Sequence, residues 1–104
     1  MTQAEPKTRT QIKTNLDAKE PPMFRVIYLN DDETPMEFVM ESLIEHFDYT
    51  IDSAQDITVS IHEQGSAVVA VLPYELAEQK GVEITVSARA EGYPLQIKLE
   101  PETA

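Results

Sequence analysis

The feature that most restricts the fold of this chain is a polar turn placed between an apolar strand and an amphipathic helix. Residues 24–29, Phe-Arg-Val-Ile-Tyr-Leu, are β-branched and aromatic, which is typical of a strand. Residues 30–33, Asn-Asp-Asp-Glu, favour a turn because short polar side chains hydrogen-bond to the nearby backbone. Thr34, Pro35 and Glu37 then match a capping-box helix start with Thr34 as the N-cap. The sequence therefore predicts a strand that passes through a tight turn into a helix.

This first helix is expected to end near residue 47, because its apolar residues recur at intervals of three and four. They are Met36, Val39, Met40, Leu43, Ile44 and Phe47. A second helix is predicted over about 52–63, with Asp52 or Ser53 as its cap, although Ile-Thr-Val-Ser-Ile at 57–61 has strand propensity. Gly65 is expected to end it in the left-handed conformation.

The second half of the chain alternates strand and helix signals. The continuous apolar run at 67–72 is typical of a central strand, and Pro73 begins a third helix that Gly81 weakens and Gly92 ends. Residues 95–99 alternate apolar and polar, as in a half-buried strand. The predicted fold class is α+β, with order β-α-α-β-α-β and three helices that cover a small three-stranded antiparallel sheet.

The N-terminal region differs in composition from the rest. Residues 1–20 carry four basic and three acidic side chains but few large apolar ones, so they cannot offset the entropy cost of ordering. Pro21 and Pro22 then fix an extended entry into the fold. We expect a flexible extension over 1–22 and one folded domain over 23–104.

Charge and cysteine content exclude several classes of function. The net charge of −11 repels nucleic acid and anionic membrane surfaces, so neither is expected as a partner. An apolar run of about 20 residues, which a membrane span needs, is missing, and so is a secretory signal, which predicts a cytoplasmic protein. The absence of cysteine rules out disulfides and thiol chemistry.

The densest polar cluster is Asn30, Asp31 and Asp32, for which turn chemistry is the simplest explanation. A functional interpretation is a cation site, and an organic ammonium suits it better than a metal, because the glycine and distal glutamate of an EF-hand loop are missing. His46 and His62 lie on the two predicted helices without a catalytic motif around them. Neither a metal nor a cofactor is predicted, and no nucleophile, phosphate-loop or zinc-protease motif supports an enzyme.

Four segments together resemble the ClpS adaptor family. They are Leu-Asn-Asp-Asp-Glu-Thr-Pro-Met-Glu-Phe-Val at 29–39, Ile-His-Glu-Gln-Gly at 61–65, Glu-Leu-Ala-Glu-Gln-Lys at 75–80, and Pro94-Leu95. The resemblance spans about residues 22–100. It implies a monomeric, non-enzymatic bacterial adaptor that binds N-degron proteins beginning with Phe, Tyr, Trp or Leu. The adaptor would deliver them to the N-terminal domain of the ClpA unfoldase of the ClpAP protease.

The resemblance also implies a role for individual residues. The substrate's α-amino group would be held by Asn30, Asp31 and His62. Its first side chain would enter a pocket built from Asp32, Thr34, Met36, Val39, Ile61 and Leu95, with Thr58 at the mouth. Glu75 and Lys80 would contact the unfoldase.

Thr58 departs from the family pattern, which often has a methionine gate at this position. Threonine is smaller, polar and stiffer at χ1, so we expect altered selectivity among N-terminal residues, as in a second paralogue with its own substrates. Two interpretations from other classes stay open. One is a small carboxylate-rich metal-binding enzyme that uses Asp31, Asp32 and His62, and the other is an acidic docking module without a peptide pocket.

Overall fold

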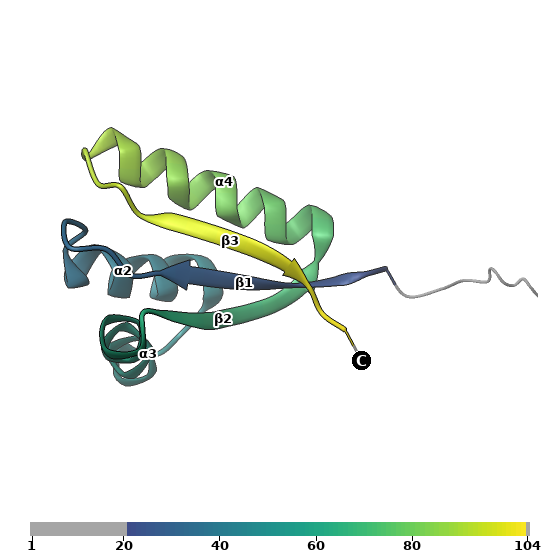
Figure 1. Ribbon diagram of the computed structural model, residues 1–104, viewed down its shortest axis with the longest axis horizontal. Helices are drawn as coiled ribbons and strands as arrows, with labels where there is room; N and C mark the ends of the chain where they lie inside the picture. The colour runs from purple at the N-terminus through teal and green to yellow at the C-terminus, as the bar shows by residue number, and fades with distance from the viewer. Residues whose placement is uncertain (1–20, 104) are drawn as a thin grey trace, which may run out of the picture.

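The computed structural model describes residues 21–103 and has the predicted α+β fold (Figure 1). Residues 1–20 of the predicted extension lie outside the described part. The elements follow the order β-α-α-β-α-β expected from the sequence. They are β1 (Met23–Leu29), α2 (Met36–Phe47), α3 (Ile51–Gln64), β2 (Ser66–Pro73), α4 (Tyr74–Ala90) and β3 (Gln96–Pro101).

The three strands form one antiparallel sheet with β1 in the middle, in the order β2-β1-β3. The apolar run at 67–72, predicted to be a central strand, is therefore an edge strand. A continuous apolar run suggests burial on both faces, but Val68 and Val71 remain 45% and 37% exposed. Their partners on β1 are Ile27 and Arg25. Among the strands of residues 21–103, only β1 is hydrogen-bonded on both sides. The positions of the other elements are therefore set relative to its two ends.

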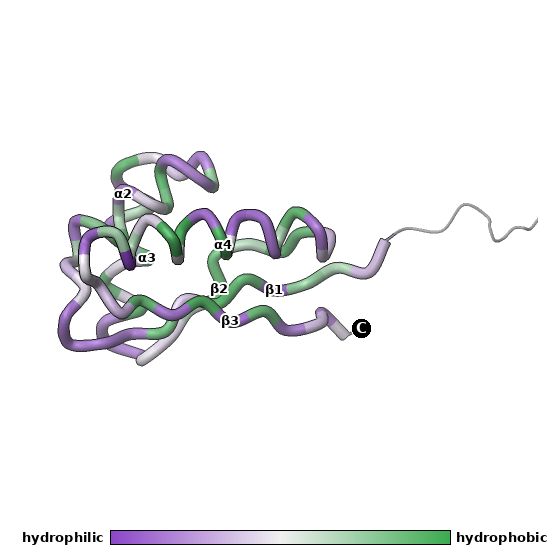
Figure 2. Tube along the Cα trace, turned by 90° about the horizontal axis from the view of Figure 1, so that it is seen from above, coloured by the Kyte–Doolittle hydropathy of each residue, from purple (hydrophilic) through white to green (hydrophobic). Residues whose placement is uncertain are grey.

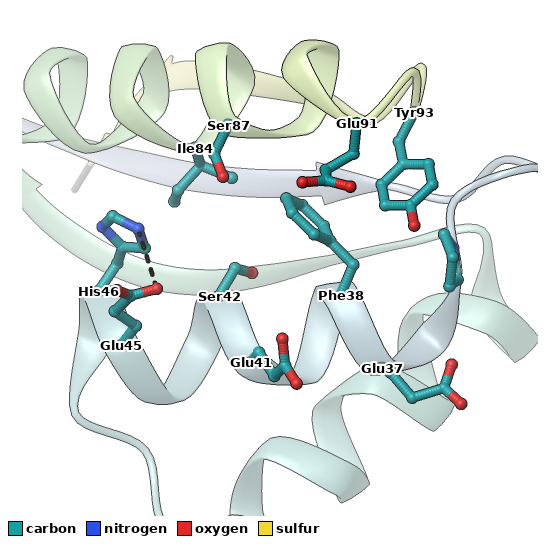
Figure 3. A pocket seen from close by; sticks show the side chains of 11 residues that line it. Glu37, Phe38, Glu41, Ser42, Glu45, His46, Ile84, Ser87, Glu91 and Tyr93 are labelled. Carbon is teal, nitrogen blue, oxygen red and sulfur yellow. Dashed lines mark ion pairs between the residues drawn. The ribbon is translucent and has the colours of Figure 1, made fainter.

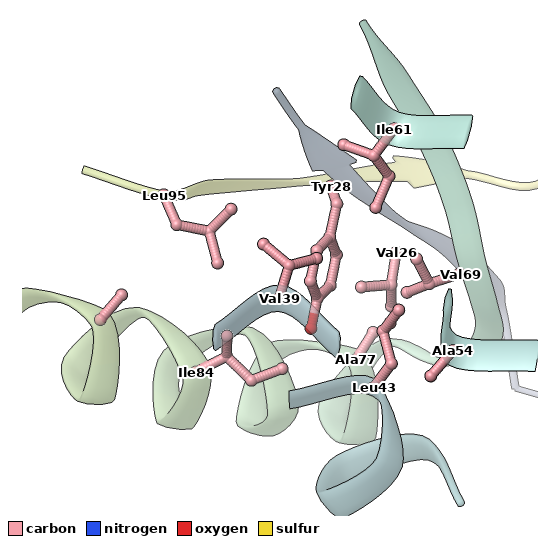
Figure 4. Close-up of a cluster of buried hydrophobic side chains, with 11 residues drawn as sticks. Val26, Tyr28, Val39, Leu43, Ala54, Ile61, Val69, Ala77, Ile84 and Leu95 are labelled. Carbon is pink, nitrogen blue, oxygen red and sulfur yellow. The ribbon is translucent and has the colours of Figure 1, made fainter. Parts of the chain in front are cut away.

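Helices α2, α3 and α4 lie on one side of the sheet, as the view from above shows (Figure 2). They enclose a core in which Val26 and Tyr28 of β1 meet apolar side chains from every helix (Figure 4). The largest fully buried side chains are Tyr28, Leu43, Ile84, Leu95 and Val26. Burying one Leu or Ile stabilises a fold by about 1.5–3 kcal/mol, so this cluster is the main source of stability. No helix within residues 21–103 is both long and apolar enough to cross a membrane.

The ends of two helices differ from the prediction. Thr34 is not the N-cap of α2: Pro35 occupies that position without a side-chain cap, because the Thr34 hydroxyl donates to Asp31 instead. In α3 the cap is Thr50, whose side-chain oxygen accepts from the Ser53 amide at 3.1 Å, rather than Asp52 or Ser53 itself. The observed cap of α2 lies one residue after the predicted one, and the observed cap of α3 lies two residues before Asp52.

The two glycines that were predicted to end helices do so. Gly65 ends α3 with φ of +92°, and Gly92 follows the end of α4 with φ of +82°. By contrast, Gly81 and the β-branched run at 82–86 do not interrupt α4. Packing of Ala77, Ile84 and Ala88 against the core holds the helix together over its full length, and tertiary contacts thus outweigh local propensity.

Candidate functional site

The turn between β1 and α2 is closed by the carboxylate of Asp31. Its Oδ1 accepts from the backbone amides of Glu33 and Thr34 at 2.8 and 2.7 Å, and its Oδ2 accepts from the Thr34 hydroxyl at 2.8 Å. These are the contacts that the turn-chemistry interpretation of the polar cluster predicts. They hold one carboxylate in a fixed position directly before the first turn of α2.

The same contacts keep Asp31 ionised. Its partial burial raises the pKa, but the hydrogen bonds from Thr34 and Glu33 and the positive charge of Arg89 outweigh burial and bring the pKa below the ordinary aspartate value. A carboxylate can accept more hydrogen bonds than the three it has here. Asp31 therefore presents a permanent negative charge with spare acceptor capacity at neutral pH.

Asn30 and His62 are brought to the same end of the sheet. The Asn30 amide donates to the carbonyl oxygen of Gly65 at 2.9 Å, which ties the end of β1 to the end of α3. His62 lies in the last turn of α3, three residues before Gly65, and is exposed. The carbonyl end of a helix carries a partial negative charge, which adds to the charge of Asp31. Asn30, Asp31 and the end of α3 thus form a polar edge suited to a cation.

Three of the predicted pocket residues belong to the core. Val39, Ile61 and Leu95 are 6%, 3% and 1% exposed and lie together in the buried cluster beside Tyr28 (Figure 4). Leu95 directly precedes β3, whose first residue Gln96 pairs with Leu29, so it lies close to the polar turn. In this structure these three side chains pack in the core next to the predicted site and do not line an open cavity.

An open cavity of about 320 Å³ lies between α2 and α3. Two predicted pocket residues line it, Met36 and Thr58, and Met36 is 43% exposed. Four others were not predicted from the sequence: Glu37, Met40, Gln55 and Val59. Spacing could have identified them, since Met36 and Met40 are four apart on α2, and Gln55, Thr58 and Val59 are three and four apart on α3.

Thr58 is buried, and its hydroxyl donates to the Ala54 carbonyl oxygen at 2.7 Å. This back-bond to its own helix satisfies the hydroxyl internally. Threonine is shorter than methionine, so the Thr58 side chain extends less far into the cavity than a methionine at this position would. Asp32 is exposed and Thr34 half-buried, both in the turn at the edge of the site.

Glu75 and Lys80 lie on α4, away from this edge. Glu75 is exposed in the first turn and lines a cavity of about 700 Å³ with Phe24 and Tyr74, whose rings meet edge-on. Phe24 lies near the start of β1, whereas the polar turn follows its end. The predicted unfoldase contact and the predicted peptide site therefore occupy opposite ends of the central strand.

A further cleft, of about 600 Å³, separates α2 from α4 and is strongly acidic (Figure 3). His46 lies there, with ring nitrogens 3.9 Å from Glu45 and 3.6 Å from Glu83. None of the residues predicted as site residues lines this cleft. Across residues 21–103, no group of three or more His, Asp or Glu side chains could hold a metal ion, so Asp31, Asp32 and His62 do not form the metal centre of the alternative enzyme interpretation.

Fold and site together define a small α+β binding module with an anionic turn at the end of β1 and an open cavity between α2 and α3. Comparison with known proteins agrees with this class. Residues 19–98 match the family model described as ATP-dependent Clp protease adaptor protein ClpS. Curated relatives include the ClpS adapter proteins of Deinococcus radiodurans, 38% identical over 91% of this chain and 84% of that protein, and of Helicobacter hepaticus, 43% identical over 88% and 94%.

A solved structure is also similar. It is Agrobacterium tumefaciens ClpS2 bound to L-phenylalaninamide, with a TM-score of 0.76 and 38% identity over 80% of this chain and 100% of that chain. The chain therefore belongs to the ClpS family of ATP-dependent Clp protease adaptors. It is an adaptor and not an enzyme, because the proteins of this family are named as adaptors.

The role of Asp31 in the turn gives a pH-dependent prediction. Because its pKa is lower in the folded than in the unfolded state, its stabilisation is fully present above about pH 4 and is lost as the pH falls through the folded-state value. Asp31→Ala should reduce the free energy of unfolding at pH 7 by about 1–2 kcal/mol, as for loss of a local side-chain cap. Urea unfolding at several pH values measures this difference.

Asp32→Ala is the matched control, since it removes the same charge from the exposed neighbour. The difference between wild type and Asp31→Ala should narrow below pH 4, whereas the control should lose little at any pH. An equal effect of both variants at pH 7 would show that the turn does not depend on the Asp31 hydrogen bonds.

Proposed function

We propose that this adaptor binds proteins through their N-terminal residue, by a free α-amino group and a large apolar or aromatic first side chain. Two observations carry the proposal: the anionic turn at Asn30 and Asp31, and the cavity between α2 and α3 that Met36, Met40 and Val59 line. The ligand named for the similar Agrobacterium tumefaciens ClpS2 supports it. L-Phenylalaninamide has a free α-amino group and a benzyl side chain, and its carboxamide resembles the start of a peptide chain.

The α-amino group of a peptide has a pKa of about 7.7–8.0 and is mostly protonated at neutral pH. The ionised Asp31 supplies charge and acceptors, and Asn30 adds a side-chain carbonyl oxygen. His62 accepts when its imidazole is neutral. Acetylation of the peptide removes both the charge and donors, and leaving these protein groups unpaired costs about 1–3 kcal/mol for each.

The first side chain would enter between α2 and α3, where Met36 and Thr58 line the cavity. Met36 is 43% exposed, and methionine adapts its shape to a ligand more readily than branched residues do. Val39, Ile61 and Leu95 would form the apolar floor, while Asp32 and Thr34 stand at the rim.

Fluorescence anisotropy with labelled peptides that differ only in the first residue tests this proposal. Peptides that begin with Phe or Leu should bind, whereas N-acetyl-Phe and Ala should not. Burying a Leu or Phe side chain contributes about 1.5–3 kcal/mol, or roughly 10- to 150-fold in affinity over Ala. Asn30→Ala should weaken Phe binding, and Ile51→Ala, an exposed apolar residue elsewhere, serves as the control. Equal binding of acetylated and free Phe, or no binding at all, would favour the acidic docking module.

Thr58 is proposed to set the selectivity of the cavity. Thr58→Met places a long side chain at the mouth, where it should disfavour β-branched Ile relative to Leu by about tenfold, as one misfitting methyl group does. Thr58→Val, which keeps the size and loses only the hydroxyl, is the matched control and should preserve the rank order. An unchanged rank order in Thr58→Met would exclude this role.

We also propose that the adaptor delivers its substrates to the ClpA unfoldase, through Glu75 and Lys80 and with the help of residues 1–20. Glu75 and the neighbouring Tyr74 are exposed at the end of the molecule opposite the peptide site, so both partners can bind at once. Deleting residues 1–20 should leave peptide affinity unchanged and block degradation of an N-degron reporter by ClpAP. Glu75→Lys should weaken unfoldase binding, with Glu91→Lys, directly after the C-terminal end of α4, as the control. Loss of peptide affinity on deletion would place the extension in the peptide site.

A further inference from the structure

The outer side of β3 is an open sheet edge. β1 pairs with β3, and no other strand within residues 21–103 lies beyond it. The Glu102 amide donates to the Met23 carbonyl oxygen at 2.8 Å, and hydrogen-bonded pairs in an antiparallel ladder recur at every second residue. Ile97 and Leu99 therefore direct their backbone N–H and C=O groups away from β1, toward the open edge. Two donors are free there to pair with an additional strand.

This edge is one wall of a groove of about 270 Å³, whose other wall is α4. α4 runs beside β3 along its length (Figure 1). Val82 and Val86 face the groove and are 56% and 63% exposed, and Ile97 and Leu99 complete its apolar lining. A helix beside a free strand edge accommodates an extended segment, which adds backbone hydrogen bonds on one side and apolar contacts on the other.

We propose that residues 7–14 of this chain occupy the groove as an additional strand beside β3. Their sequence, Lys-Thr-Arg-Thr-Gln-Ile-Lys-Thr, alternates long polar residues with β-branched ones, the pattern of a half-buried strand. Such a strand directs Thr8, Thr10 and Ile12 to one face, toward Val82 and Val86.

The distribution of charge also favours residues 7–14 as the strand that binds in the groove. Residues 7–14 carry three basic side chains and no acid, whereas residues 21–104 carry sixteen acids and four bases. Glu78 lines the groove. On the outer face of β3, Glu100 is already paired with Lys98 at 2.9 Å, so attraction of the segment comes from Glu78 and from the net negative charge of residues 21–104.

The connection is long enough. Residues 15–20 link the segment to Pro21, and six extended residues span up to about 20 Å. Met23 lies beside Glu102, next to the end of β3, so the linker has to cross about two strand spacings, or roughly 10 Å. The C-terminal end of the segment then lies at the C-terminal end of β3, and the two run parallel. In this arrangement residues 7–14 of the extension are bound to the folded domain, and a partner that competes for this segment would displace it from the groove.

Backbone amide hydrogen exchange on the full chain, followed by NMR, tests the proposal. The amides of Ile97 and Leu99 should exchange at least about tenfold more slowly in the wild type than in Gln11→Pro, which removes a donor that faces β3. Val86→Lys should speed up the exchange of the same two amides, because it places a charged side chain in the apolar groove. The amides of Lys98 and Glu100, which face β1, should not change and serve as internal controls.

Gln3→Pro, outside the segment, and Ile51→Lys, at an exposed apolar residue on α3, are the matched control variants. Both should exchange like the wild type at Ile97 and Leu99. Identical exchange of these two amides in wild type, Gln11→Pro and Val86→Lys would overturn the proposal. Protection that disappears on dilution would also overturn it, because a segment bound within its own chain is insensitive to concentration.

Discussion

The hydrogen bonds of Asp31 fix the relation between the central strand and the first helix. One carboxylate accepts from two amides and one hydroxyl within three residues, so β1 turns into α2 without a flexible loop. α2 then brings Met36 to the surface and Val39 and Leu43 to the core. Because the same carboxylate stays ionised, the group that builds the turn also supplies the charge at the proposed peptide site.

The proposed site uses side chains that also stabilise the fold. Val39, Ile61 and Leu95 are nearly fully buried and pack around Tyr28, whose hydroxyl is hydrogen-bonded to Ser42 at 2.7 Å. The open cavity is lined instead by Met36 and Met40 on α2 and by Thr58 and its neighbours on α3. The buried residues Val39, Ile61 and Leu95 are held rigidly by the core, whereas Met36 can change its side-chain conformation. Ligand side chains of several shapes can therefore bind while the hydrogen-bonded turn at Asp31 stays fixed.

The position of β1 between β2 and β3 determines where the proposed binding surfaces lie. Its end carries the polar turn, and its start lies beside Glu75 and Tyr74, which separates the proposed peptide site from the proposed unfoldase contact. Its pairing with β3 leaves the far side of β3 open beneath α4. The proposed peptide site, the proposed unfoldase contact and the groove beside β3 are thus three separate surfaces of a small domain.

The sequence by itself determined the order of elements, the turn at 30–33, the stop at Gly65 and the family, since these depend on local spacing and backbone chemistry. It did not determine that β2 is an edge strand, that Pro35 and Thr50 are the caps, or that α4 continues through Gly81. Nor did it show that Leu95 is core while Met40 lines a cavity. Only the tertiary structure decided these points, because burial and strand neighbours depend on contacts between residues far apart in the chain.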